Sequence, residues 1–166
     1  MTPASLLNAL AVFFLAVLAV MLAVPFLYPA GTFVHLDGSP FIIDRDWSSY
    51  GLGGLVYQLG DVLCHQEYAR SFILNGSQMP VCIRDTGLLI GFAVGLFTCG
   101  YLKERIYQMR LLLIGFGLMV LSVLEFLIEH GFDVDLPEAR FVIGIASGIG
   151  ASIVVAWALH RSYDLG

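Results

Sequence analysis

The feature that most limits what this chain can fold into is a long segment, Leu6 to Tyr28, that contains no charged residue. A helix needs about 20 mainly apolar residues to cross a hydrocarbon core about 30 Å thick, and this segment is long enough. Three more apolar runs follow at about 86–102, 108–128 and 141–160. Charged residues make up 13% of the chain, against about 25% in a soluble domain. The pattern predicts a single multi-pass integral membrane domain, residues 1–166, in the cell membrane.

The longest connection, residues 29–85, is a polar loop with two local structures of its own. Tyr50–Leu63 is amphipathic, short and rich in glycine, which favours an interfacial or re-entrant helix over a fifth span. Asn75-Gly76 favours a tight turn because both residues accept positive φ, and the residues on either side can pair as a hairpin. The expected fold class is an all-α membrane protein: four transmembrane helices, a short interfacial or re-entrant helix and a small Cys/His hairpin loop.

Charges near the spans predict the orientation in the membrane. The loop between the second and third spans is basic and carries Lys103, Arg105 and Arg110. The loop between the third and fourth spans is acidic and carries Glu129, Asp133, Asp135 and Glu138 beside Arg140. Basic loops stay on the cytoplasmic side, so both termini are expected inside and residues 29–85 outside. The net charge is −5 and the bases form no cluster, which argues against nucleic acid as a partner.

Small residues form stripes on two of the expected helices. Gly87, Gly91 and Gly95 are spaced four apart, and Gly144 and Gly148 share a stripe with Ser147, Ala151 and Ser152. In lipid such stripes let helix backbones approach closely. They predict tight packing within the chain, or contact with a second copy or with a partner in a larger membrane complex.

Residues 61–87 contain the densest group of chemically active side chains. Folding back at the predicted hairpin would bring Cys64 and His65 near Cys82 and Asp85. Thiolate, imidazole and carboxylate are zinc ligands, and a tetrahedral ion needs four of them. One interpretation is therefore a zinc site built from Cys64, Cys82 and Asp85 with His65 as the fourth ligand.

The same residues allow other interpretations, and the sequence leaves them open. A disulfide between Cys64 and Cys82 would suit a loop that faces an oxidising exterior. Thiol redox chemistry would need a cysteine of low pKa, for which nearby arginines are suited. A purely structural role is the third alternative, with Asp85 or Thr86 capping the next helix and arginines pairing with acids. The polar residues expected to support the site are Asp61, Gln66, Arg70, Ser71, Arg84 and Thr86.

This stretch resembles the signature of a family of small prokaryotic membrane proteins known as domain of unknown function 2085. The pattern C-H-Q-x-x-x-R-S-F-x-x-x-G-x-x-M-P-V-C-x-R-D-T-G runs from Cys64 to Gly87. Many members look as if they have a second cysteine at the position of Asp85. The resemblance implies a class of membrane protein and a motif, without a reaction.

Glu125 is an ionisable residue inside the third span, with Glu129 one turn further on the same helical face. Acids at this depth usually face the protein interior or water. The position of Glu125 therefore indicates one of two roles. It lies on a proton or ion path, or it is the structural partner of an arginine, with Arg84 or Arg70 preferred. Three functions follow: a metal-binding or disulfide-stapled site in the outward loop, a non-catalytic subunit of a membrane complex, and a minimal transporter.

Overall fold

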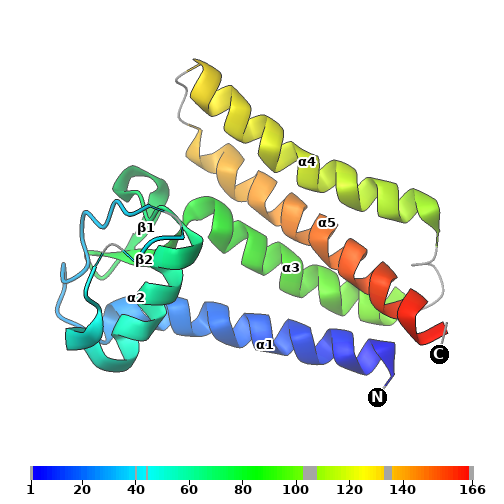
Figure 1. Ribbon diagram of the computed structural model, residues 1–166, viewed down its shortest axis with the longest axis horizontal. Helices are drawn as coiled ribbons and strands as arrows, with labels where there is room; N and C mark the ends of the chain where they lie inside the picture. Colours follow the sequence, from blue (N-terminus) through cyan, green and yellow to red (C-terminus); the bar gives the residue numbers. More distant parts are fainter. Residues whose placement is uncertain (1, 40, 44, 103–107, 133–135, 165–166) are drawn as a thin grey trace. The chain divides into compact units, whose positions relative to one another are not determined.

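The computed structural model of the chain describes residues 2–39, 41–43, 45–102, 108–132 and 136–164, without the side chains of residues 130 and 164 (Figure 1). Two compact units are present. The helical unit comprises Met1–Ala16 and Thr86–Gly166, and the loop unit comprises Val17–Asp85. Four charged residues on which the predicted orientation depends lie outside the described residues. They are Lys103 and Arg105 of the basic loop and Asp133 and Asp135 of the acidic loop.

Among the residues that the structure describes, four helices are long and apolar enough to cross a membrane, which confirms the expected fold class. They are α1 (Pro3–Ala23), α3 (Ile83–Leu102), α4 (Met109–Phe132) and α5 (Pro137–Asp164). A 3-10 turn, η1 (Val24–Phe26), continues the first. The last helix begins four residues before the apolar run expected at 141, because Pro137 has a φ suited to the first helical position and needs no amide donor there.

Glycine and serine allow the helices of the helical unit to pack closely. A Cβ on Gly91 would meet the Ile145 backbone, and one on Gly148 would meet the Leu88 carbonyl, so α3 and α5 touch through their backbones. Between α4 and α5 the hydroxyls of Ser122 and Ser147 lie 2.6 Å apart. The predicted glycine stripes are therefore used for packing within the chain.

The loop unit contains the short helix α2 (Gly51–Leu63) and a two-stranded antiparallel sheet, β1 (Ser71–Leu74) and β2 (Ser77–Cys82). Two 3-10 turns, η2 (Ser48–Tyr50) and η3 (Tyr68–Arg70), precede α2 and β1. The hairpin turns at Asn75 and Gly76, whose φ values are 50° and 69°, as the predicted turn requires.

A small aromatic core holds the loop unit together. The rings of Phe33 and Tyr57 stack with centroids 3.9 Å apart, and Trp47 stacks on Tyr57 at 5.5 Å. Buried amides connect this core to the hairpin, since Gln78 Oε1 accepts the Leu36 N–H at 3.0 Å. Stacked rings and buried amide hydrogen bonds therefore hold α2 against β2, although the described residues of the loop unit form no large apolar core.

Candidate metal-binding site

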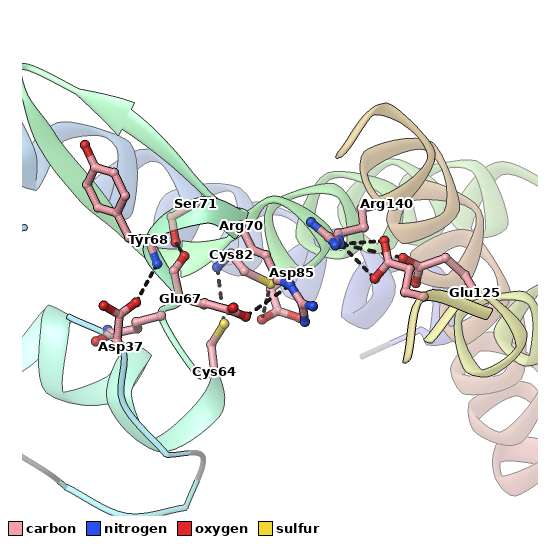
Figure 2. Close-up of polar contacts among 12 residues, drawn as sticks. Asp37, Cys64, Glu67, Tyr68, Arg70, Ser71, Cys82, Asp85, Glu125 and Arg140 are labelled. Carbon is pink, nitrogen blue, oxygen red and sulfur yellow. Dashed lines mark hydrogen bonds and ion pairs between the residues drawn. The ribbon is translucent and has the colours of Figure 1, made fainter. Parts of the chain in front are cut away.

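Three potential metal ligands, one from each of three neighbouring elements, meet in the loop unit. Cys64 follows the last residue of α2, Cys82 ends β2, and Asp85 lies in the first turn of α3. The two sulfur atoms and a carboxylate oxygen all lie within 4.8 Å of one another. Figure 2 shows the three side chains directed toward one another. The predicted fold-back thus brings Cys64, Cys82 and Asp85 together.

Hydrogen bonds connect the members of this cluster. The Cys82 N–H donates to Cys64 Sγ at 3.3 Å, and the Cys82 thiol donates to Asp85 Oδ2 at 3.1 Å. Cys64 is buried, while Cys82 and Asp85 are half-buried. All three cysteines of the chain are free thiols in this structure. The arrangement is therefore a partly accessible dithiol–carboxylate cluster.

The position of Cys64 depends on a close approach between α2 and β2. A Cβ on Gly60 would collide with the Pro80 carbonyl, so only glycine lets the two backbones meet there. The Cys64 N–H then donates to the Gly60 carbonyl at 2.8 Å. On the other side, Ser71 pairs with Cys82 in the hairpin. The cluster consequently rests on a helix end and a strand end that are both held by backbone contacts.

Electrostatics favour the neutral form of the innermost thiol. A hydrogen bond with Cys82, burial, and unfavourable electrostatic interactions of a Cys64 thiolate with Cys82 and Asp85 raise the pKa of Cys64 above its ordinary value of 9.0. Without a cation, Cys64 therefore keeps its proton at neutral pH. A bound cation would reverse this preference, because it stabilises the thiolate.

His65, the expected fourth ligand, lies outside the cluster. Cys64 has an extended backbone, with φ −142° and ψ 149°, so successive side chains project to opposite sides. Cys64 is therefore buried while His65 is exposed, and His65 lines a shallow pocket of about 540 Å³ with Asp37, Glu67 and Tyr68. The structure brings together three of the four predicted ligands.

Three of the six predicted supporting residues form hydrogen bonds that stabilise the loop unit around the cluster. Asp61 accepts the Trp47 indole N–H at 3.0 Å, and Gln66 donates to the carbonyls of Tyr57 and Pro80. The Ser71 hydroxyl donates to the Glu67 carbonyl at 2.9 Å.

The two arginines and the threonine differ in burial. Arg70 pairs with Glu67 at 3.0 Å, and both side chains are substantially exposed. Arg84 is half-buried, and Thr86 is buried in the first turn of α3.

Glu125 lies in the helical unit, where its partner is an arginine that the sequence did not suggest. Arg140 Nε lies 2.8 and 2.9 Å from the two oxygens of Glu129. It lies 3.7 Å from Glu125, and Figure 2 shows Arg140 and Glu125 near each other. The Arg140 side chain is 1% exposed. A signal existed: Glu129 and Arg140 flank a short connection, and the ends of two antiparallel helices joined in this way lie side by side.

Fold and sequence together define the class: a multi-pass membrane protein with four candidate spans among the described residues and a dithiol–carboxylate cluster where the second of them begins. The chain belongs to the family described as "Predicted membrane protein (DUF2085)", whose sequence profile matches residues 64–154. The resemblance inferred from the motif is thereby confirmed.

Three relatives show how far the similarity extends. An uncharacterised protein of Methanothermobacter thermautotrophicus is 27% identical over 59% of this chain and 88% of its own length. An uncharacterised protein of Methanocaldococcus jannaschii is 30% identical over 56% of this chain and 61% of its own. A TsgA homolog of Erwinia tasmaniensis is 37% identical over 63% of this chain, which corresponds to 26% of that protein. No solved structure shows a significant match to the chain.

Proposed function

We propose that this membrane protein binds a zinc-like transition-metal ion through Cys64, Cys82 and Asp85. The observation that carries the proposal is the convergence of two thiols and a carboxylate within 4.8 Å, from three different elements. These are zinc ligands, and around a tetrahedral ion their donor atoms lie about 3.5–3.8 Å apart. Only small side-chain movements separate the cluster from that arrangement.

Three protein ligands leave the fourth position of a tetrahedral ion to water or another small ligand. Such an open position is typical of catalytic zinc sites, whereas structural sites have four protein ligands. The exposed side of Cys82 and Asp85 supports access for a small ligand. Recruitment of His65, the residue next to Cys64, would instead close the site.

Cobalt substitution tests the proposal directly. The reduced protein in detergent is titrated with Co²⁺, whose thiolate complexes absorb visibly, and then with Zn²⁺ as competitor. Cys64→Ser and Cys82→Ser should each lose the thiolate absorption. Cys99→Ser is the matched control, because Cys99 is buried in the core of the helical unit and, among the described residues, belongs to no metal-ligand group. Absence of metal uptake by the reduced wild type would refute metal binding.

The purified protein before reduction decides between the alternatives. Thiols at Cys64 and Cys82 that become alkylatable only after reduction would favour the disulfide. A partner protein retained at constant stoichiometry in mild detergent, without bound metal, would favour a subunit role.

The ion pair with Arg140 supports a structural role for Glu125 over a transport path. Proton flux into liposomes that falls in Glu125→Gln would reverse that assignment.

A further inference from the structure

The outer face of α2 is a stripe of leucines. Leu52, Leu55, Leu59 and Leu63 are between 56% and 83% exposed. At about 100° per residue these four positions fall within an arc of about 80°. The opposite face packs into the loop unit through Gly53, Gly54, Tyr57, Gly60 and Asp61. Apolar side chains thus cover the face of α2 that the rest of the loop unit leaves open.

A second segment enlarges this apolar surface. Phe41, Ile42 and Ile43 are each at least half exposed. Ile43 lines a groove of about 660 Å³ together with Leu52 and Leu55. The two segments therefore form one surface, which we call the leucine face and define as Phe41–Ile43 with the four leucines of α2. Contiguous exposed apolar patches of this kind mark interaction sites.

The leucine face lies next to the point where a membrane span ends. The candidate span that contains α1 ends at Phe26, and the next residue, Leu27, is 73% exposed. Tyr28 donates a hydrogen bond to the Tyr50 carbonyl, and a Cβ on Gly53 would collide with the Tyr28 ring. The start of α2 is consequently held beside the end of α1, as Figure 1 shows.

The hairpin turn is held at the same place. Asn75 Nδ2 donates to the carbonyls of Pro25 at 3.0 Å and Tyr28 at 3.1 Å. The α2–hairpin pair is therefore attached to the end of the span by hydrogen bonds as well as by the chain itself. This attachment keeps the start of α2 beside Phe26 and Leu27, which are 62% and 73% exposed.

We infer that α2 is an interfacial helix whose leucine face inserts at the boundary between the lipid headgroups and acyl chains. A helix in this position has one apolar face in the acyl region and its other face toward water or protein. In α2 that other face packs on β2 and the aromatic core. The occupant of the leucine face is therefore the bilayer, and the proposal does not depend on metal binding.

Quenching by brominated lipids tests the inference in the full-length protein. Leu59→Trp and Leu63→Trp are reconstituted into phosphatidylcholine vesicles with and without bromine on the acyl chains, and the emission of the wild type is subtracted. Both added tryptophans should lose most of their emission to the brominated lipid and resist aqueous iodide. Ala69→Trp is the matched control, because Ala69 is exposed and lines the polar pocket around His65. It should be quenched by iodide.

Two results would overturn the inference. Quenching of both α2 tryptophans by iodide and not by bromine would place the leucine face in water. Protection from both quenchers would show that protein covers it, either a second copy or another part of this chain. Circular dichroism of each variant confirms that the helices are retained, and the two α2 positions provide independent measurements.

Discussion

Arg140→Met is the sharpest test of the helical unit, because it removes a buried cation and keeps an apolar side chain of similar length. The guanidinium Nε lies within 3.0 Å of both Glu129 oxygens and 3.7 Å from Glu125, and the Arg140 side chain is only 1% exposed. Removal of one member of a buried ion pair costs about 3–5 kcal/mol, since the remaining charge stays desolvated. We expect a loss of that size in the free energy of unfolding.

The distances also predict an order among the carboxylates. Glu129→Gln should cost more than Glu125→Gln, because both Glu129 oxygens lie within 3.0 Å of Arg140 Nε and Glu125 Oε1 lies 3.7 Å from it. The double variant Arg140→Met with Glu129→Gln should be less destabilised than the sum of the single variants, since they share one interaction. Glu138→Gln is the matched control, because Glu138 is exposed in the first turn of α5.

The assay is unfolding of the purified protein by increasing sodium dodecyl sulfate in a mild detergent, followed by circular dichroism. If Arg140→Met unfolds within about 1 kcal/mol of the wild type, the buried ion pairs do not stabilise the helical hairpin as argued. Equal losses in Arg140→Met and Glu138→Gln would lead to the same conclusion, because the effect would then follow from surface charge alone.

Three further predictions concern the cluster and the helix packing. Zinc affinity should rise with pH, because metal binding must displace the proton of Cys64. Calorimetry in buffers of different ionisation enthalpy should show that binding releases protons. An affinity for zinc that does not change with pH would contradict this prediction. Without metal, the raised pKa of Cys64 contributes to the free energy of unfolding at pH values below 9.0, the ordinary pKa of a cysteine. This contribution should decrease as the pH rises above 9.0, which thermal unfolding at several pH values can measure. Gly91→Ala should cost about 1–3 kcal/mol, because the new methyl group meets the Ile145 backbone, which cannot move away. Gly117→Ala is its control, since a Cβ there meets nothing within 4 Å, and similar losses in both variants would argue against close α3–α5 packing.

Much of the fold was predictable because its causes are local. A bilayer requires each span to satisfy its own backbone hydrogen bonds, so runs of apolar residues were enough to predict the four helices. The hairpin followed from Asn75-Gly76, whose turn chemistry depends on those residues themselves. The apolar pattern of the last span begins after Arg140, whereas α5 itself begins at Pro137.

The cluster was predictable only in part, because the direction of a side chain depends on the backbone around it. Cys64 and His65 are adjacent, which suggested that both are ligands. The extended backbone after α2 sends them to opposite sides instead. Arg140 was counted as a loop charge, and its burial depends on the start of α5 and on the contact with α4. The cytoplasmic placement of the termini stays a prediction.

By itself, the sequence determined that this protein resides in the membrane, where its helices and hairpin form, and to which family it belongs. Only the tertiary structure decided which donors meet and which charges are buried. Apolar runs and turn residues act over a few positions, so they can be read along the chain. The cluster depends on Gly60 touching Pro80, and the buried ion pairs depend on α4 lying against α5. Such contacts join distant residues, so they exist only once the chain has folded.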